Sequence, residues 1–381
     1  MKNLLFYGTT DYGLNLNNSD ELKFKELSKN FNAFVITYGN TNVEKKHKDV
    51  LIKYLKKPKN LFFQYLKFYF LNYKILSKFI KDKNIDIVSA KDPISALLPT
   101  LIKKFSNKEI KIVIEHHGDF LNLLLNQRRF YFKNIIKLST KLISNFTYRN
   151  CDIIRGVEIE YTSSLSNKYN KKFICFPAWV DYSIYKDLNT QRKNFLYVGN
   201  IIPRKGVMFL IENYGTFSKK YDINEDLIIA GSYPNKEYYD KCKDFIVKNK
   251  IENIKFIGEK NPNEISRLMN SSRLLLMASS YEGLPRVLIE SGLCGLPSIA
   301  TNIQGIRKPF GEDGGTLLYE LNNSDEFINK VQNFWFDGQK LKKSDNDKIF
   351  TIYHVMDKFN LTYAQVSRMV YIKPYYGKNT T

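Results

Sequence analysis

Two acidic residues, Glu282 and Glu290, lie eight positions apart in the segment SSYEGLPRVLIE. The apolar run Leu274 to Met277 predicts a strand before this segment. Pro285 predicts the first turn of a helix, because an N–H group at that position has no hydrogen-bond partner within the helix and proline lacks one. Glu282 is then expected outside the helix and Glu290 about two turns into it. Carboxylates only accept hydrogen bonds, which suits sugar and ribose hydroxyls. The alternative is a helix-start acid at Glu282 and a solvated surface residue at Glu290.

A second candidate site is the segment Phe195 to Gly206, which reads FLYVGNIIPRKG. A predicted strand ends at Gly199, and Arg204, Lys205 and Gly206 precede a predicted helix. Backbone N–H groups at a helix start, with two cations beside them, suit a phosphate group. Because such turns are more often only turns, both interpretations stay open.

A histidine pair lies in the first half of the chain, in Glu115-His116-His117-Gly118. It follows the predicted strand Ile110 to Ile114, so His117 is expected at the carboxyl end of a sheet. An imidazole there could bind a phosphate or a sugar hydroxyl. A histidine bonded to the backbone is the alternative.

The elements that must position these residues are short apolar runs that alternate with helical patterns until about Tyr319. This order predicts an α/β protein with parallel sheets covered on both faces. The polar segment Trp179 to Lys193 predicts a linker between a domain at 1–180 and a second at 194–340. The predicted strands are Leu4 to Tyr7, Ala33 to Thr37, Ile85 to Ser89, Ile110 to Ile114, Asp152 to Arg155, Phe173 to Phe176, Phe195 to Val198, Leu227 to Ala230, Ile254 to Ile257, Leu274 to Met277, Pro297 to Ala300 and Thr316 to Leu318.

The end of the chain differs from this alternation. Apolar residues at helical spacing predict a terminal helix over about 348–381, which could pack back on either domain. Asp345-Asn346-Asp347 fits the letters of a DxD metal motif, but no predicted strand precedes it. We interpret it as a helix cap and expect no metal site.

The composition is that of a soluble globular protein, with 381 residues of which 43% are hydrophobic and 25% charged. The net charge of +21 indicates either an anionic partner or scattered surface lysine. No RNA or DNA motif accompanies it, so binding to nucleic acid is the least favoured function. The four cysteines form no CxxC or Cys/His cluster, which fits the reduced cytosol.

The positive charge is clustered in residues 128–150, which contain no acid. A basic stripe beside an apolar stripe predicts contact with an anionic membrane surface, or a helix docked on the first sheet with its lysines in water. Leu61 to Ile80 is apolar, but three lysines interrupt it, so we expect no membrane span there. The basic stripe consists of Arg129, Lys133, Lys137 and Lys141.

The order of motifs from Phe195 to Tyr319 resembles the nucleotide-sugar half of the family 4 retaining glycosyltransferases. The resemblance implies the GT-B fold, in which two Rossmann-like, doubly wound parallel-sheet domains face each other across a cleft. The motifs that carry it are Gly199 with Lys205-Gly206, Ala230-Gly231, Phe256-Ile257-Gly258, Glu282-Gly283-Leu284-Pro285 with Glu290, Gly295-Leu296-Pro297 and Gln304-Gly305.

The resemblance also implies a role for each matching residue. Glu282, the first acid of the family's EX7E motif, would contact the donor sugar, and Glu290 would bind the ribose hydroxyls. Lys205 would hold the pyrophosphate. The other implied donor contacts are Gly199 and Arg204 in the first loop, the backbone N–H groups of Gly283, Leu284 and Val287, and Glu259 and Lys260 near the base.

The chain departs from the family at Asn200, where the family usually has an arginine, and Arg204 could supply that cation instead. In the first half, the resemblance places Gly13, His117 and Gly118 in acceptor-side loops.

The implied reaction moves a sugar from a UDP- or GDP-linked donor to a glycan or lipid-linked saccharide, as in cell-surface polysaccharide synthesis. It retains the anomeric configuration and needs no metal or cofactor, and Glu282, Lys205 and His117 are the implied catalytic residues. Catalysis would rest on positioning and on charge stabilisation at the pyrophosphate. We expect a cytoplasmic protein, at the inner face of the plasma membrane if residues 128–150 bind lipid. The alternatives are a nucleotide-sugar epimerase of the same fold and a non-catalytic nucleotide-sugar-binding protein.

Overall fold

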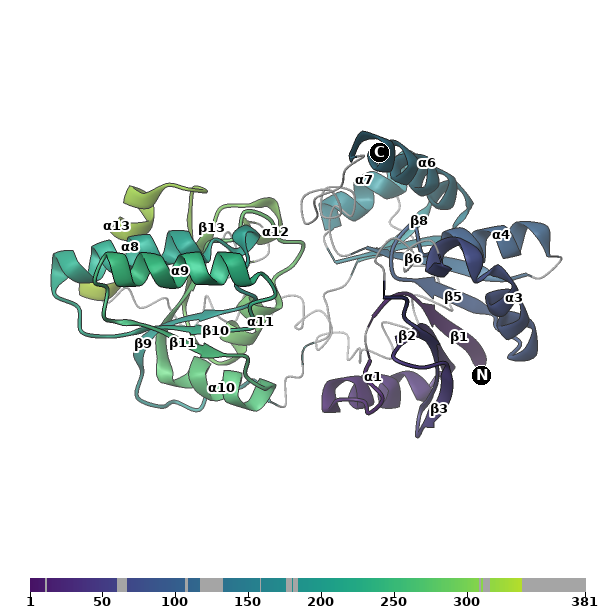
Figure 1. Ribbon diagram of the computed structural model, residues 1–381, viewed down its shortest axis with the longest axis horizontal. Coiled ribbons are helices and arrows are strands. Elements are labelled where there is room, and N and C mark those ends of the chain that lie inside the picture. Colours follow the sequence, from purple (N-terminus) through teal and green to yellow (C-terminus); the bar gives the residue numbers. More distant parts are fainter. Residues whose placement is uncertain are drawn as a thin grey trace, which may run out of the picture. The chain divides into compact units, whose positions relative to one another are not determined.

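The computed structural model divides into two compact units, which over the described residues run from Met1 to Cys175 and from Val180 to Asp337, and each contains its own sheet (Figure 1). It describes residues 1–10, 12–59, 67–106, 109–116, 133–157, 159–175, 180, 184–307, 310 and 316–337. The features discussed above that lie outside these residues are residues 61–66 of the apolar segment, His117, Gly118, residues 128–132, Asp345-Asn346-Asp347 and the helix expected over 348–381.

The first unit has its described strands in one sheet. In chain order they are β1 (Lys2–Tyr7), β2 (Phe31–Gly39), β3 (Val43–His47), β4 (Val50–Lys56), β5 (Ile87–Ala90), β6 (Lys111–His116), β7 (Ile153–Gly156) and β8 (Lys172–Cys175). Their order in the sheet is β3-β4-β2-β1-β5-β6-β7-β8. Neighbours run parallel except β3, which forms an antiparallel pair with β4 at the edge.

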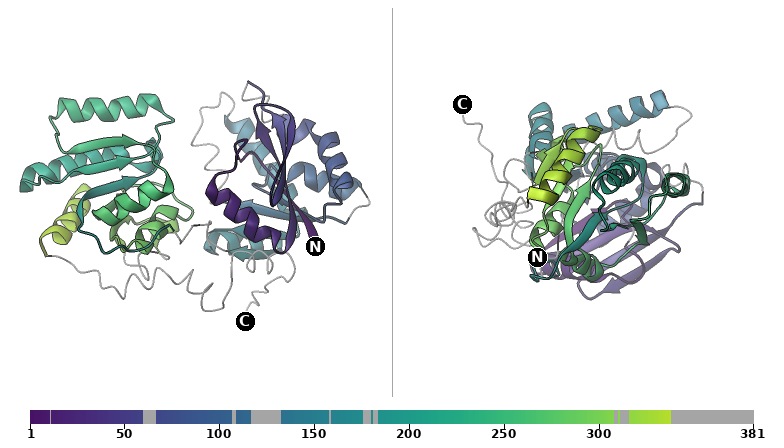
Figure 2. Two further views of the ribbon diagram at one scale, coloured as in Figure 1. Left: turned by 90° about the horizontal axis from the view of Figure 1, so that it is seen from below. Right: turned by 90° about the vertical axis from the view of Figure 1, so that its left-hand side faces the viewer.

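Helices cover both faces of this sheet (Figures 1 and 2). Because neighbouring side chains of a strand point to opposite faces, Leu4 and Leu5 of β1 belong to different cores. Leu4 packs with Phe24, while Leu5 packs with Phe79 and Leu98. The helical segments are α1 (Asn18–Ser28), the π-helical turn η1 (Lys67–Leu71), α3 (Tyr73–Asp82), α4 (Leu97–Phe105), α6 (Lys133–Asn150) and α7 (Ile159–Tyr169).

The second unit repeats the architecture with a fully parallel sheet in the order β11-β10-β9-β12-β13-β14. Its strands are β9 (Lys193–Val198), β10 (Leu227–Ala230), β11 (Ile254–Gly258), β12 (Ser272–Met277), β13 (Ser298–Thr301) and β14 (Thr316–Tyr319). Its helices are the 3-10 turn η2 (Pro203–Lys205), α8 (Val207–Tyr221), α9 (Lys236–Lys248), α10 (Pro262–Ser271), α11 (Arg286–Leu293), α12 (Gln304–Ile306) and α13 (Ser324–Asp337).

The central strand β9 separates the two cores of this unit. Phe195 packs with Leu210 of α8, whereas Leu196 packs with Leu288 of α11 and Met269 of α10. Each of these side chains is almost completely buried, and burying one stabilises the fold by about 1.5 to 3 kcal/mol. The sheet edge that carries the loops after β9 and β12 is therefore built on a rigid base.

The predicted strands agree with observed strands to within two residues at each end. Two observed strands, β3 and β4, were missed. Val43–His47 is short and polar, with two lysines, as edge strands often are. Val50–Lys56 is mostly apolar, with lysines at positions 53 and 56, and lies between β3 and β2. The expected position of Glu290 was also wrong. Since α11 begins at Arg286, with Pro285 as its N-cap, Glu290 is the fifth residue of the helix and about one turn into it.

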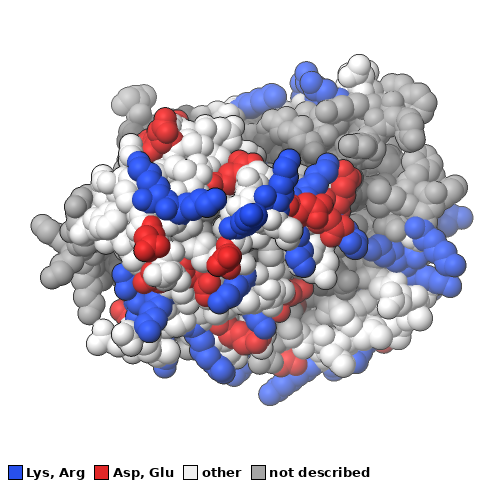
Figure 3. All heavy atoms as spheres, turned by 60° about the vertical axis from the view of Figure 1, so that its left-hand side comes forward, with Lys and Arg blue, Asp and Glu red and all other residues white. Residues whose placement is uncertain are grey.

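The surface shows no single-sign patch on the face drawn in Figure 3, where basic side chains lie among acidic ones over the described atoms. On that face, the high net charge is consistent with scattered lysine. Of the helices that the structure describes, none combines the length and the apolarity that crossing a bilayer requires.

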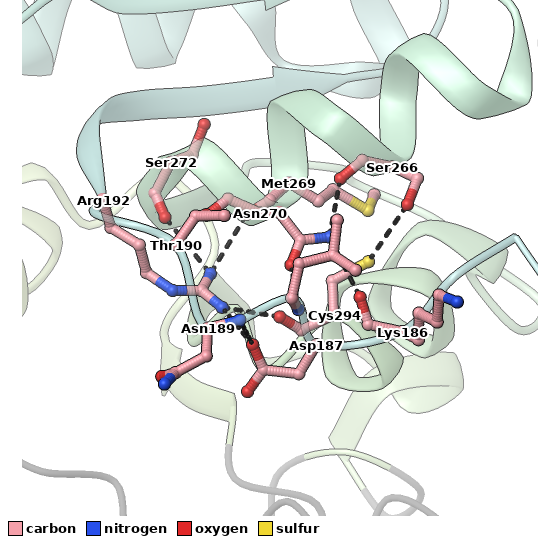
Figure 4. A network of polar contacts seen from close by, with 11 residues as sticks. Lys186, Asp187, Asn189, Thr190, Arg192, Ser266, Met269, Asn270, Ser272 and Cys294 are labelled. Carbon is pink, nitrogen blue, oxygen red and sulfur yellow. Dashed lines mark hydrogen bonds and ion pairs between the residues drawn. The ribbon is translucent and has the colours of Figure 1, made fainter.

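The segment Ile184–Arg192, before β9, is fastened to α10 and to the end of α11 (Figure 4). Asn270, only 2% exposed, donates to the carbonyl of Lys186 at 3.0 Å and accepts from the N–H of Leu188 at 2.7 Å. Its amide also donates to Ser266 of its own helix. The buried side-chain amide of Asn270 thus provides hydrogen-bond partners for three backbone groups.

Arg192 makes the second set of these contacts. Its guanidinium pairs with Asp187 at 3.3 Å and donates to three backbone carbonyl oxygens (Figure 4). These belong to Met269 at 3.1 Å, Ser272 at 3.3 Å and Cys294 at 2.6 Å. The described part of the expected linker is therefore an integral part of the second unit.

We predict that Asn270→Ala lowers the free energy of unfolding of the second unit by about 2 to 4 kcal/mol, because it leaves buried backbone groups without partners. Urea unfolding of the full chain, followed by far-UV circular dichroism, measures this. Ser271→Ala, at the exposed neighbouring position, serves as control and should change stability by less than about 0.5 kcal/mol. Equal unfolding curves for the two variants would contradict the fastening role.

Candidate functional site

The loop after β9 approaches the end of β12 more closely than a side chain at its turn would allow. Gly206 adopts a left-handed conformation (φ 64°, ψ 29°) between η2 and α8. A Cβ atom at this position would lie 2.2 Å from the carbonyl oxygen of Ala278. Only glycine fits both constraints. Arg204 and Lys205, immediately before it, are thereby held beside the loop that follows β12.

These two cations converge on Glu282. The Nζ atom of Lys205 lies 2.5 Å from Oε1 of Glu282, and a guanidinium nitrogen of Arg204 lies 3.5 Å from the same oxygen. Arg204 also donates to the carbonyl oxygen of Tyr281 at 2.5 Å, and its own carbonyl accepts from the N–H of Ser280 at 2.9 Å. Two cations share one carboxylate, which leaves a net positive charge at the sheet edge.

The loop Ser279–Pro285 is also held from its other side. A Cβ atom on Gly305, in α12, would lie 2.1 Å from the carbonyl oxygen of Glu282 and 2.4 Å from that of Gly283. The hydroxyl of Thr301, at the end of β13, donates to the carbonyl of Ser279 at 2.6 Å. The loop that carries Glu282 therefore lies between the loops that follow β9 and β13.

Glu290 is buried in α11, with 7% of its surface exposed. Burial raises the pKa of its carboxyl group, and contacts with Arg286 and with the hydroxyl of Tyr185 act in the opposite direction. Arg286 lies 3.3 Å from its Oε1 atom. The partner that a buried acid requires is thus present. Tyr185 was not singled out from the sequence, because a lone tyrosine in a polar segment gives no signal.

Backbone N–H groups cluster at the start of α11. Within the described ranges, the N–H groups of Gly283, Leu284 and Val287 have no hydrogen-bond acceptor from the protein. The first N–H groups of a helix carry partial positive charge and favour an anion. Lys205 and these amides therefore point to the same class of ligand.

Glu259 and Lys260 follow β11, next to the end of β10. The N–H of Gly231 donates to the carbonyl of Gly258 at 2.9 Å, which ties the two loops together. Glu259 is exposed, and Lys260 forms an ion pair of 3.6 Å with Glu264. In the part of the chain described, no hydrogen bond or ion pair joins them to Glu282 or Glu290.

Asn200 follows Gly199, whose N–H donates to Ala230 of β10. The side-chain oxygen of Asn200 accepts from the hydroxyl of Ser232 at 3.0 Å, so this side chain connects the loops after β9 and β10. Its amide brings no charge to the site. Arg204, which the sequence offers as a substitute for the missing cation, contacts Glu282.

The carboxyl ends of the first sheet hold a different set of groups. Gly13 is left-handed (φ 59°), and its carbonyl accepts from the hydroxyl of Tyr54. At the ends of β6 and β7, Glu115 forms an ion pair of 2.6 Å with Arg155 and accepts from Ser89 at 2.6 Å. The partner of Glu115 could not be found from the sequence, since only the fold brings β7 beside β6. A charged residue in the apolar run of β7 was the available signal.

Within the described ranges, no three His, Cys, Asp or Glu side chains are grouped so as to hold a metal ion.

Comparisons with known proteins bear on the family and the fold. Residues 184–348 match the family described as Glycosyl transferases group 1. An uncharacterized glycosyltransferase of Methanocaldococcus jannaschii is 27% identical over 85% of this chain and 86% of its own length. The UDP-Gal:alpha-D-GlcNAc-diphosphoundecaprenol alpha-1,3-galactosyltransferase of Escherichia coli is 28% identical over 47% of this chain, and the match covers only 43% of that protein.

Among solved structures, HepE of Anabaena in complex with UDP-glucose superposes with a TM-score of 0.71 at 13% identity, over 97% of this chain and 99% of that one. The resemblance at this identity concerns the fold. The chain therefore has the GT-B fold of two parallel-sheet α/β units, and its second unit carries a glycosyl transferases group 1 domain.

Proposed function

We propose that this protein is a retaining glycosyltransferase that uses a nucleotide-diphosphate sugar. The observation that carries the proposal is the convergence of Lys205 and Arg204 on Glu282 at the carboxyl ends of β9 and β12. In open parallel sheets, ligands bind at this edge. Cations beside a carboxylate suit a ligand that has both phosphates and hydroxyl groups.

The proposed donor lies along this edge. Lys205, Arg204 and the N–H groups at the start of α11 bind the two phosphates, which replace Glu282 as the partner of Lys205. Glu282, once released, accepts from hydroxyl groups of the sugar. Glu290 accepts from the ribose hydroxyls, and the base lies near Glu259 and Lys260.

The proposed chemistry depends on charge at the leaving group. As the bond between the sugar and the phosphate breaks, negative charge grows on the pyrophosphate, and Lys205 and Arg204 stabilise it in place. The acceptor hydroxyl attacks from the same face and passes its proton to the departing phosphate. We propose that no metal ion is needed, because these side chains supply the positive charge.

The acceptor is proposed to be a glycan or a lipid-linked saccharide bound by the first unit, with Gly13, His117 and Gly118 in its loops. Support comes from the E. coli relative, whose name specifies a UDP-linked donor and a diphosphoundecaprenol-linked acceptor. The free thiols of Cys151, Cys242 and Cys294 support a location in the reducing cytoplasm.

Helix α6 supports contact with a membrane. Leu138 and Leu142 are 60% and 61% exposed, and Lys137 and Lys141 beside them are exposed too. Exposed leucines one turn apart, next to lysines, suit the interface of an anionic bilayer. We propose that residues 128–150 bind the protein peripherally to the inner face of the membrane.

The proposal is tested by incubating the protein with UDP- and GDP-linked sugars and a polyprenyl-diphosphate saccharide, with and without EDTA. We expect a product whose new linkage has the anomeric configuration of the donor, as NMR reports, and a rate that EDTA leaves unchanged. A product formed from the donor alone would indicate an epimerase. Absence of any thermal shift with UDP, GDP or ADP would contradict the assignment of the donor site.

Substitutions of Glu282 and Glu290 are predicted to affect different kinetic quantities. Glu282→Gln should lower kcat by about a hundredfold or more with little change in donor affinity, because its contact with the sugar matters most in the transition state. Glu290→Gln should weaken donor binding about tenfold to a hundredfold, because it loses charge-assisted bonds to the ribose. Steady-state kinetics and calorimetry with the donor separate these effects.

The matched control for both variants is Glu212→Gln, an exposed acid on α8, which should change neither quantity. If Glu282→Gln and Glu290→Gln both keep full activity, the assignment of the EX7E pair is wrong.

Membrane binding is predicted to depend on α6. Lys137→Gln combined with Lys141→Gln should weaken co-sedimentation with phosphatidylglycerol-containing vesicles about tenfold or more, since each lysine near an anionic surface contributes about 1 kcal/mol. Lys219→Gln with Lys220→Gln, an exposed lysine pair on α8, is the control of equal charge change. If both double variants lose vesicle binding equally, the effect is one of net charge, and the assignment of membrane binding to α6 is wrong.

A further inference from the structure

Tyr185 belongs to the fastened segment Ile184–Arg192, and its side chain is buried against α11. Its ring lies in the same core cluster as Leu288 and Ile289 of that helix. Its hydroxyl makes a side-chain hydrogen bond with the carboxyl group of Glu290. A residue that lies before the first strand of the second unit therefore reaches a carboxylate of the proposed donor site.

The backbone on both sides of Tyr185 is fixed. The carbonyl of Ile184 accepts from the hydroxyl of Ser266 at 2.8 Å, and the carbonyl of Lys186 accepts from Asn270 at 3.0 Å (Figure 4). Both donors belong to α10, which packs on the same face of the sheet as α11. The position of the Tyr185 hydroxyl is thus determined by the fold of the second unit.

The end of α11 is attached to the same segment. Arg192 donates to the carbonyl of Cys294, and a Cβ atom on Gly295 would lie 2.5 Å from a carboxylate oxygen of Asp187. Side chains of the segment therefore lie directly against the backbone at the end of α11, which attaches the segment to the helix that carries Glu290.

The remaining groups around Glu290 leave Tyr185 as its buried partner. Arg286 lies on the same helix, but about half of its side chain is exposed, so solvent screens its charge. Burial raises the pKa of the Cys294 thiol to about 11, so this neighbour is uncharged near neutral pH. Lys205 and Arg204, in the loop after β9, are engaged by Glu282.

We propose that Tyr185 is a positioning residue of the donor site, whose hydroxyl holds the Glu290 carboxylate so that its other lone pairs accept from the two ribose hydroxyls. The inference rests on the proposed function and adds a residue to it. A carboxylate has about four acceptor positions, so one bond from tyrosine leaves room for a vicinal diol. Without that bond the side chain can rotate, and ordering it again opposes binding.

The role has a consequence for pH dependence. Burial raises the pKa of Glu290, and the bond from Tyr185 stabilises the ionised form that ribose binding requires. Removing the hydroxyl raises the pKa of Glu290 further. As the pH falls, affinity for the nucleotide should then begin to decrease at a higher pH than in the unmodified protein.

The experiment compares the full-length protein with Tyr185→Phe by calorimetric titration of UDP and of GDP at a series of pH values from neutral to acidic. For whichever nucleotide binds, we expect Tyr185→Phe to bind about tenfold more weakly at neutral pH, the effect of losing one hydrogen bond to a charged group. The acid limb of its affinity profile should shift to higher pH.

Tyr214→Phe is the matched control. Tyr214 is equally buried in the second unit, and its hydroxyl donates at 2.5 Å to the backbone carbonyl of Glu225, in the core on the other face of the sheet. This variant loses a buried tyrosine hydroxyl without touching Glu290. Its affinity and pH profile should match those of the unmodified protein, even if its stability is lower.

The possible outcomes separate this inference from the function on which it rests. If Glu290→Gln weakens nucleotide binding while Tyr185→Phe keeps the affinity and pH profile of the unmodified protein, Tyr185 has no positioning role and the donor site stands. Equal effects of Tyr185→Phe and Tyr214→Phe would likewise overturn the inference. If neither nucleotide binds the unmodified protein, both proposals fail.

Discussion

The close approach of the loop after β9 to the loop after β12 is the constraint on which the rest of the site depends. Gly206 permits it, because its missing side chain lets the backbone come up against Ala278. The bond from Ser280 to the carbonyl of Arg204 then fixes the spacing. With the backbones at this distance, Lys205 reaches Glu282 directly. A wider separation would leave both charges in solvent, where an ion pair contributes little.

The same constraint sets the charge of the site. Two cations and one carboxylate at one point carry a net positive charge, which suits the doubly charged pyrophosphate of the proposed donor. The fold holds this arrangement from the other side as well, since Gly305 lies against the backbone of Glu282 and Gly283. Preorganised charge of this kind needs little rearrangement when a ligand arrives.

Much of the second unit was predictable from the sequence, because its strands are short apolar runs and its loops carry glycine, proline and charge at strand ends. The common location of Lys205 and Glu282 could be anticipated from parallel strands whose carboxyl ends share an edge, whereas their ion pair was not predicted. The edge strand β3 could not be anticipated, since its polar, lysine-containing segment lacks the apolar signal. The partners Tyr185 of Glu290 and Arg155 of Glu115 were also missed, because each contact joins segments that are distant in the sequence and only the fold brings together.

The contrast between Glu282 and the pair Glu259 and Lys260 bears on how such a site can diverge. The loop that carries Glu282 is enclosed on two sides, so most substitutions there would disturb backbone contacts. Glu259 is exposed, and Lys260 pairs only with its own helix neighbour Glu264 among the described residues. Changes at these two positions leave the enclosed loop intact. Natural selection, or a protein engineer, can therefore alter one end of the sheet edge for a different ligand group while the other end keeps its charge arrangement.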